Sequence, residues 1–120
     1  MCYLTSAIAG KVAVTMATGD GWCPITRASE LIGRKWYPVI IDRLLDGPKR
    51  FGEIERMIPG ISAKVLSDSL EELERERIVT RRVRPTRPIL ITYGLTQKGA
   101  GLRAVLAAMR EWGERWLTAE

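Results

Sequence analysis

Arginine side chains gather in the second half of the sequence, and no carboxylate lies among them. The cluster consists of Arg77, Arg81, Arg82, Arg84 and Arg87, and no Asp or Glu falls between residues 77 and 92. Guanidinium groups bind phosphate oxygens through charge-assisted and often bidentate hydrogen bonds. The pattern therefore favours a surface for a polyanion, although an ordinary solvated edge would carry similar charges.

Two helical patterns with a tight break precede this cluster. A short apolar pattern over 51–58 stops at Pro59-Gly60, and Ser62 is then a good N-cap for a helix over 62–76. The apolar stripe of that second helix is formed by Leu66, Leu70 and Leu73. A short helix, a fixed turn and a capped helix present the N-terminal end of the second helix at a set angle, as entry into the major groove of DNA requires.

The rest of the chain completes a mainly helical domain with one hairpin. Helices are expected over 24–33 and 37–47, and the second should be central because it is apolar around most of its circumference. After Ile78 the pattern changes to a β-hairpin, with Val79–Arg84 paired to Leu90–Leu95. Thr96 then caps a long last helix. The predicted fold class is mainly α with a small β-hairpin, a winged helix-turn-helix with flanking N- and C-terminal dimerisation helices.

The length of 120 residues suits one domain, and the chain reads as a weakly patterned arm over 1–21 followed by a domain over 22–120. In the arm, Ile8 and Val12 fit one helical face, while the alternation of Val12 and Val14 also fits a strand. No apolar run reaches the length of about 18 residues that a membrane span needs, so we expect a cytoplasmic protein with no membrane partner.

The composition argues against an enzyme. The chain has no histidine, so histidine-based triads and histidine metal sites are excluded, and two cysteines cannot form a structural zinc site within one chain. We expect no cofactor and no metal. The net charge of +5 suits a nucleic-acid partner without proving one, since many soluble domains carry similar charges.

Double-stranded DNA is the expected partner, and the candidate contacts lie on the two-helix unit and on the hairpin. These residues are Lys49, Arg50, Ser62, Lys64, Val65, Ser67, Asp68, Arg82, Arg84 and Arg87. Four acids, Glu71, Glu72, Glu74 and Glu76, crowd the far half of the second helix, so only its N-terminal half is expected to face DNA. For Lys64 the alternative is an ordinary solvated lysine.

The last helix carries more apolar surface than one small domain is expected to bury. The predicted homodimer interface consists of Leu102, Leu106, Met109, Trp112 and Trp116, with Ile8 and Val12 of the arm packed on it. The alternative is packing within the chain, against residues 24–45.

Three ordered stretches, "CPITRASELIGRKW", "LLDGPKRFGEIERMIPGISAKVLSDSLEEL" and "ITYGLTQKGAGL", carry a resemblance over about residues 23–113. Together they resemble the HxlR-type (MarR-like) family of winged helix-turn-helix transcription regulators. The resemblance implies a homodimer on a two-fold related operator, a recognition helix at 62–76 and a wing at 79–95. We expect a sequence-specific DNA-binding transcription regulator. The alternative is a winged-helix protein-interaction module of a transcription complex without sequence readout. Operator, target genes, direction of regulation and any small-molecule effector stay open.

Three positions depart from the family pattern. Ser69 stands where a basic residue is frequent, which would weaken a phosphate contact. Arg77 stands where glycine is common, and Thr92 stands where an acid is frequent. If position 77 needs a positive φ, Arg costs about 1 kcal/mol relative to Gly.

Cys23 directly precedes Pro24 at a predicted helix N-terminus. The helix dipole can lower the pKa of a thiol there, and the thiolate is the reactive form. The resemblance implies that a cysteine at this position can sense oxidants or electrophiles, so Cys23 is a redox-sensing candidate. The alternative is a small buried hydrophobe.

Overall fold

The computed structural model describes residues 23–117. The chain divides into two compact units, Met1–Lys35 and Trp36–Glu120. In the first unit, helix α3 (Pro24–Ile32) begins with a proline in its first turn. It ends as predicted at Gly33, whose backbone N–H donates to the carbonyl oxygen of Ser29 at 2.8 Å. The predicted boundary of the arm at residue 21, with Ile8 and Val12, lies outside the described residues.

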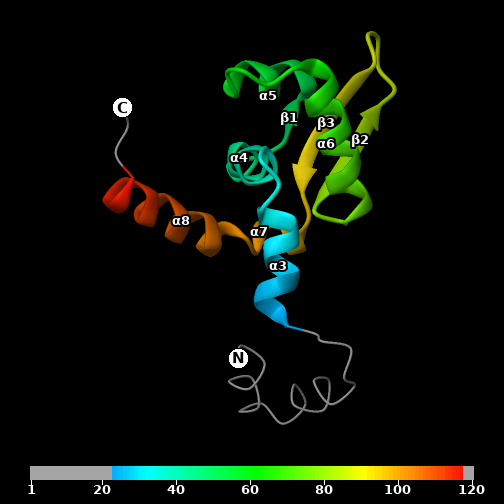
Figure 1. The fold of residues 1–120 in the computed structure, drawn as a ribbon. Coiled ribbons are helices and arrows are strands. Elements are labelled where there is room, and N and C mark those ends of the chain that lie inside the picture. Colours follow the sequence, from blue (N-terminus) through cyan, green and yellow to red (C-terminus); the bar gives the residue numbers. More distant parts are fainter. Residues whose placement is uncertain (1–22, 118–120) are drawn as a thin grey trace. The chain divides into compact units, whose positions relative to one another are not determined.

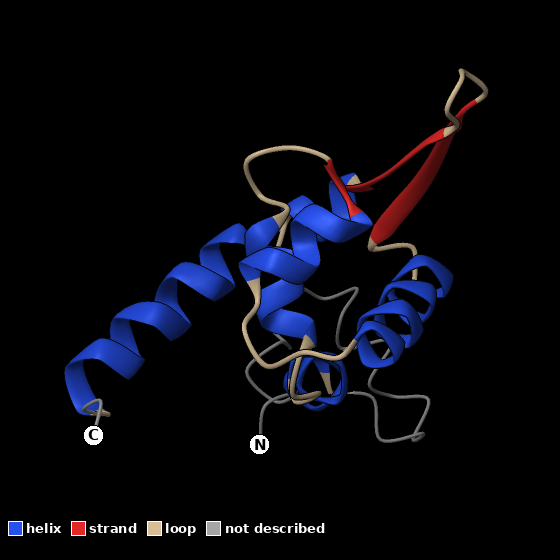
Figure 2. Cartoon of the chain, turned by 90° about the horizontal axis from the view of Figure 1, so that it is seen from above, coloured by secondary structure: helices blue, strands red, loops and turns tan. Residues whose placement is uncertain are grey.

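The second unit is a winged helix-turn-helix, as predicted (Figure 1). Its elements follow in the order α4 (Tyr37–Arg43), β1 (Lys49–Arg50), α5 (Phe51–Met57), α6 (Ala63–Arg75), β2 (Val79–Arg84), β3 (Leu90–Leu95), α7 (Gln97–Ala100) and α8 (Arg103–Trp116). In two perpendicular views, α8 extends away from this unit on the side opposite the β2–β3 hairpin (Figures 1 and 2).

The core forms around α4, which is as central as its apolar sequence predicted. Ile40 and Ile41 of α4 have no exposed surface, and α4 ends earlier than predicted because residues 44–46 form a turn. The other large side chains with at most 2% exposed surface in the described part of this unit are Leu44, Ile54, Leu66, Leu70, Leu73, Ile78 and Val79. Burial of such side chains contributes about 1.5–3 kcal/mol each, so these residues hold α4, α5 and α6 around one core.

The turn between α5 and α6 depends on a glycine. Gly60 has a φ of 93°, a conformation that residues with a Cβ rarely adopt. Ser62 then caps α6, and its side-chain oxygen accepts a hydrogen bond from the backbone N–H of Val65 at 3.1 Å. The Pro-Gly break therefore ends α5 sharply and starts α6 at a fixed point.

The hairpin has the predicted bounds, but the sheet has a third strand that the sequence did not predict. β2 and β3 pair antiparallel from Val79 opposite Leu95 to Arg84 opposite Leu90. β1 pairs with β3 through Lys49 opposite Tyr93 and Arg50 opposite Thr92, which makes the strand order β1-β3-β2. β1 has two residues and no alternating apolar pattern, so periodicity could not reveal it.

The predicted single last helix is two helices. Thr96 is the expected N-cap, and its side chain accepts from the backbone N–H of Gly99 at 3.0 Å. The helix that it caps, α7, ends at Ala100, and α8 starts at Arg103 after Gly101 and Leu102. Gly99 lies so close to the turn after α6 that a Cβ would come within 2.4 Å of the Ile78 carbonyl oxygen. α7 is therefore a short helix that packs through Gly99 against the turn after α6.

The turn that follows α6 holds an arginine in a left-handed conformation. Arg77 has a φ of 63°, which L-residues adopt at a cost of about 1–2 kcal/mol. The Thr96 hydroxyl donates to the Arg77 carbonyl oxygen at 2.6 Å, and the Lys98 ammonium donates to the Glu76 carbonyl oxygen at 2.9 Å. These bonds satisfy carbonyl groups at the end of α6 and hold the strained turn in place.

Replacing Arg77 by Gly should raise the free energy of unfolding by about 1 kcal/mol, because glycine adopts positive φ without steric cost. Within residues 23–117 the Arg77 side chain makes no hydrogen bond or ion pair that the change would remove. Urea-induced unfolding measures the effect. The matched control is Arg75→Gly, two residues earlier in α6, which should lower stability by about 1 kcal/mol. Equal losses in both variants would contradict the account of the turn.

Candidate nucleic-acid interface

The packing of α6 decides which of its side chains face outward. Leu66, Ser69, Leu70 and Leu73 are buried, whereas the predicted contacts Ser62, Lys64, Val65, Ser67 and Asp68 are all exposed. The outward surface of the N-terminal half thus offers an ammonium group, two hydroxyl groups, a carboxylate and the methyl groups of Val65. These groups can hydrogen-bond base edges and contact a thymine methyl group in a major groove.

Ser69 does not belong to this surface. Its side chain lies on the buried face of α6 and only 6% of the residue is exposed. The expectation that a missing basic residue at this position weakens a phosphate contact stays a prediction, and burial of Ser69 agrees with it. Because Ser69 is buried, its hydroxyl group is not presented on the outward surface of α6.

Lys64 and Asp68 form an ion pair on the exposed face of α6. The Lys64 ammonium donates to Asp68 Oδ2 at 3.1 Å, and the two side chains are 84% and 61% exposed. An exposed pair at i and i+4 contributes little to stability, about 0.3–0.5 kcal/mol. A phosphate or a base edge can therefore replace Asp68 as the partner of Lys64 at small cost.

The register of the sheet sorts the hairpin arginines by face. Paired residues share a face, so Arg82 lies beside Thr92 and Arg84 beside Leu90, while Arg81 and Tyr93 occupy the other face. Arg82 and Arg84 together line a groove of about 640 Å³ whose other lining residues include Leu44, Leu45 and Pro48. The structure thus brings these two predicted contacts together.

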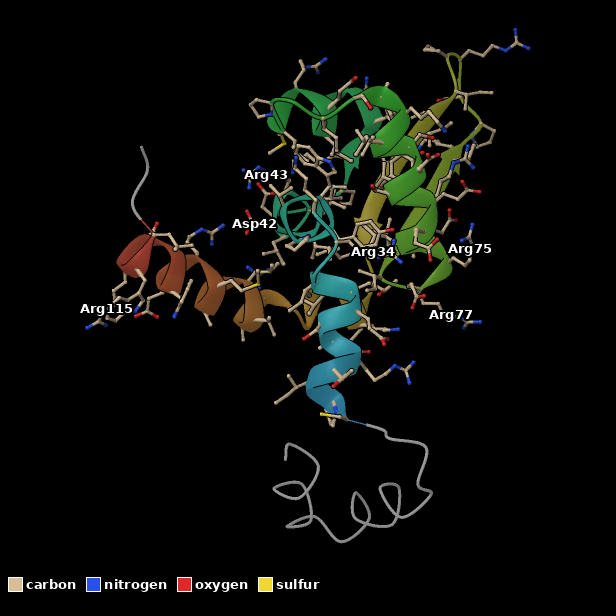
Figure 3. All side chains as sticks on the ribbon, in the orientation of Figure 1. Arg34, Asp42, Arg43, Arg75, Arg77 and Arg115 are labelled. Atoms are coloured by element: carbon tan, nitrogen blue, oxygen red, sulfur yellow. The ribbon has the colours of Figure 1, made fainter. Side chains whose placement is uncertain are left out.

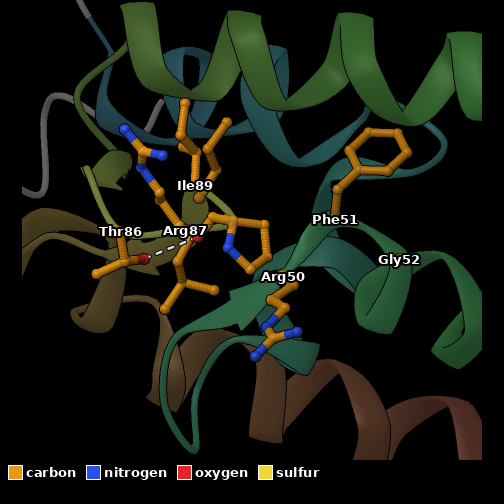
Figure 4. A pocket seen from close by; sticks show the side chains of 9 residues that line it. Arg50, Phe51, Gly52, Thr86, Arg87 and Ile89 are labelled. Carbon is orange, nitrogen blue, oxygen red and sulfur yellow. Dashed lines mark hydrogen bonds between the residues drawn. The ribbon is translucent and has the colours of Figure 1, made fainter.

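A second groove joins the hairpin tip to the start of α5 (Figure 4). It has a volume of about 450 Å³ and is lined by Arg50 and Arg87, among others. The tip itself is braced by the Thr86 hydroxyl, which donates to the Pro88 carbonyl oxygen at 2.8 Å. Two arginines that are 37 positions apart in sequence therefore border one groove.

Lys49 is the predicted contact with the least support. Its ammonium group donates to Asp46 Oδ1 at 2.7 Å, and its side chain is only 18% exposed. The hydrogen bond and the charge of Lys49 lower the pKa of Asp46, so the carboxylate stays ionised as a partner. Lys49 thus holds the turn before β1, and its charge is largely neutralised by Asp46.

Charge is distributed unequally along the interface. Within residues 23–117, none of Arg81, Arg82, Arg84 and Arg87 forms an ion pair, so these cations are available to a polyanion. At the far end of α6, by contrast, Arg75 pairs with Glu72 at 2.6 Å. Figure 3 shows Arg75 and Arg77 at the end of α6 that is farther from the hairpin tip. The acid-rich end of α6 is thus separate from the basic tip.

The outer part of α8 exposes a stripe of large apolar side chains. Met109 is 42%, Trp112 57% and Trp116 65% exposed. Leu106, predicted at the same interface, is instead buried at 5% exposure, and Leu102 is half-buried. Leu106 therefore fits the alternative, in which the side chain packs within its own chain. The buried Leu106 side chain attaches α8 to the rest of the second unit.

Cys23 is the N-cap residue of α3, at the helix N-terminus where it was predicted. It is buried, and its sulfur is disulfide-bonded rather than a free thiol. The chain holds one other cysteine, Cys2, which lies outside the described residues. Cys23 thus lies at the N-terminus of α3 as one half of a disulfide, and its role as a redox sensor stays a prediction.

Metal sites and membrane-spanning helices are not found in the described part of the chain. Within residues 23–117, no group of three or more His, Cys, Asp or Glu side chains is placed to hold a metal ion. None of the helices in this range has the length and apolar content of a membrane span.

Comparison with known proteins gives the family. Residues 31–120 match the model of the HxlR-like helix-turn-helix family. The chain belongs to this family. It is 44% identical over 99 residues to the HTH-type transcriptional regulator YodB of Bacillus subtilis (strain 168), covering 82% of this chain and 88% of YodB. This HxlR-like protein is therefore a helix-turn-helix transcriptional regulator and not an enzyme.

Solved structures of relatives share the fold of this HxlR-like protein. The reduced form of YodB from B. subtilis superposes with a TM-score of 0.72 at 44% identity, over 80% of this chain and 95% of that one. The redox regulator HypR in its oxidized form superposes with a TM-score of 0.75 at 36% identity, over 81% of this chain and 100% of that one.

Sequence reasoning missed one cluster of charged residues in this HxlR-like protein. Asp42 of α4 pairs with Arg43 and with Arg110 of α8. The signal in the sequence is weak: an acid at position 42 interrupts an otherwise apolar helix, but nothing indicates a partner 68 residues away.

Arg87→Ala should weaken binding to every duplex and flatten its salt dependence by about one unit of log K against log[salt], as the loss of one phosphate contact requires. Fluorescence anisotropy over a salt series measures the slope. Arg75→Ala is the matched control, because Arg75 lies at the acid-rich end of α6 and should leave the slope unchanged. An unchanged slope for Arg87→Ala removes this residue from the phosphate contacts.

Proposed function

We propose that the protein is a sequence-specific regulator that binds double-stranded DNA as a homodimer, with α6 in the major groove and the β2–β3 wing on the backbone or minor groove. The observation that carries this proposal is the exposed N-terminal half of a capped α6 next to a wing whose arginines have no acid partners within residues 23–117.

The two parts of the interface have different tasks in this proposal. The N-terminus of α6 brings backbone N–H groups and the positive end of the helix dipole to a phosphate, which sets the register of the helix. Lys64 and Ser67 then reach base edges and supply discrimination. Arg82, Arg84 and Arg87 supply affinity that depends on salt rather than on sequence.

The homodimer is supported by the apolar stripe of α8. Trp112 and Trp116 are more than half exposed, and aromatic side chains of this size are enriched where protein surfaces associate. Pairing of two α8 helices would bury the stripe, and reading of successive major-groove faces requires two copies of α6 about 34 Å apart, one turn of DNA. Sedimentation of a monomer at micromolar concentration would contradict this assembly.

The first test is fluorescence anisotropy with a duplex from upstream of the protein's own gene against a scrambled duplex. We expect at least about a thousandfold preference for the specific site at physiological salt, because base contacts add to shared phosphate contacts. Equal affinity for both duplexes, persisting in a selection from random sequences, would favour a protein-interaction module without sequence readout.

Lys64→Ala separates base reading from phosphate binding in the same assay. Loss of a base contact should cost about 1–3 kcal/mol and relax the preference at one base pair. Uniform weakening across all sequences would instead identify Lys64 as a phosphate contact.

We further propose that Cys23 makes DNA binding responsive to oxidants. Its place at the N-terminus of α3, its disulfide and the similarity to YodB and HypR support this role, since HypR is described as a redox regulator. Oxidation of two thiols to one disulfide releases two electrons and two protons, which an oxidant such as diamide accepts.

Diamide treatment should therefore change the DNA affinity by at least about fivefold, and dithiothreitol should restore it. Cys23→Ser should abolish the response while leaving the affinity of the reduced protein unchanged. Cys2→Ser, compared in parallel, shows whether the second thiol is Cys2 or a thiol of another molecule. A full response in Cys23→Ser would exclude the proposed role.

A further inference from the structure

Asp42 connects two arginines that belong to different parts of the second unit. Its Oδ2 accepts from Arg43 Nη1 at 2.6 Å, and its Oδ1 accepts from Arg110 Nη2 of α8 at 2.7 Å. The Asp42 side chain is 16% exposed, whereas that of Arg110 is 53% exposed. One half-buried carboxylate on α4 thus binds the exposed helix α8, and Figure 3 shows Asp42 and Arg43 next to each other on α4.

The connection continues to the helix-turn-helix. Arg43 Nε donates to the carbonyl oxygen of Met57 at 3.3 Å. Met57 is the last residue of α5, directly before the turn that sets the start of α6. A chain of hydrogen bonds therefore runs from Arg110 through Asp42 and Arg43 to the end of α5.

Few other interactions fix the direction of α8. Within residues 23–117, Leu106 is the only buried residue of α8. Near its start, Arg103 Nη2 donates to the Leu45 carbonyl oxygen at 3.0 Å. Arg103 and Leu106 hold the first part of the helix, and Arg110 is the next anchor outward, immediately before the exposed tryptophans. Without the Arg110 contact, α8 could tilt about its first turns.

A small tilt is enough to matter for DNA. A helix of 14 residues is about 21 Å long, so a tilt of about 10° moves its far end by about 3.6 Å. The rise per base pair is about 3.4 Å along each strand. A tilt of this size in each protomer changes the distance between two copies of α6 by about one base pair or more.

We propose that Asp42 is a specificity-determining positioning residue: by holding Arg110 and Arg43 together, it fixes α8 relative to the helix-turn-helix and so selects the spacing of operator half-sites. This inference rests on the proposed homodimer that pairs through α8. It assigns to Asp42 and Arg110 no contact with DNA and no part in reading bases.

The experiment uses the full chain and a set of duplexes with two identical half-sites. Their centres are separated by about 10 bp, and by one, two or three base pairs more or fewer. Anisotropy gives the affinity for each spacing, and a duplex with a single half-site gives the affinity of one protomer. Sedimentation velocity of each variant reports the dimer.

Wild-type protein should prefer its best spacing over the neighbouring spacings by about tenfold or more. In Asp42→Asn and in Arg110→Ala this preference should fall to within about threefold, while affinity for the single half-site stays unchanged. Arg110→Lys keeps the charge and should restore the preference. Glu72→Gln, which removes one of the two acid partners of Arg75 at the far end of α6, is the matched control and should keep the wild-type spacing profile.

The outcomes are distinguishable. If wild-type protein is a dimer that binds paired half-sites and Arg110→Ala keeps a sharp spacing preference, the inference is wrong and the proposed function stands. Arg110→Ala is decisive here because an exposed arginine can be truncated without disturbing the core. If Asp42→Asn and Arg110→Ala also lose single half-site affinity to the same degree, their role is structural, and the inference fails. If wild-type protein is monomeric or binds no paired site, the proposed homodimer and this inference fail together.

Discussion

The burial of one face of α6 is the constraint on which the interface depends. Leu66, Leu70 and Leu73 are at most 1% exposed, and burial of each contributes about 1.5–3 kcal/mol. The helix cannot turn about its axis without exposing them. This packing therefore determines that Lys64 and Ser67 face outward and that Ser69 does not. The chemistry offered to a groove follows from core packing, and the Ser62 cap and Gly60 turn only decide where the helix begins.

Local partners then divide the basic residues by task. Lys49 is held by Asp46 and is mostly buried, so it contributes to the turn before β1. Lys64 has an exposed partner in Asp68 that competes only weakly. The wing arginines have no acid partner within residues 23–117, so their charge is not neutralised within this part of the chain and is available to a polyanion. A sequence count of charges treats all three cases alike, although they differ in what each cation is free to bind.

Periodicity and capping predicted the parts of the fold that depend on neighbours in sequence. Patterns among residues at most four positions apart were enough to predict three features: the bounds of β2 and β3, the caps formed by Ser62 and Thr96, and the buried stripe of α6. The strand β1, the end of α7 at Ala100 and the burial of Leu106 depend instead on distant partners. The link from Asp42 to Arg110 spans 68 residues, and no pattern within one helix reveals it. For the site, the residue types on α6 and their exposure could be predicted from the sequence. That Arg50 and Arg87 line one groove became visible only in the tertiary structure.

A regulator that reads paired half-sites must hold two quantities constant: the face of α6 and the distance between its two copies. The first is secured by many buried side chains, so changing it costs as much as unfolding part of the core. In the proposed homodimer the second depends on α8, which within residues 23–117 buries only Leu106 and is otherwise held by hydrogen bonds of Arg103 and Arg110. A coupling free energy of about 1–3 kcal/mol, typical of regulatory ligands and covalent switches, is too small to move α6 in its core. It is large enough to compete with an exposed ion pair. If the protein acts as the proposed homodimer, control of DNA affinity is therefore more effective when it acts on the dimer geometry than when it acts on α6 itself.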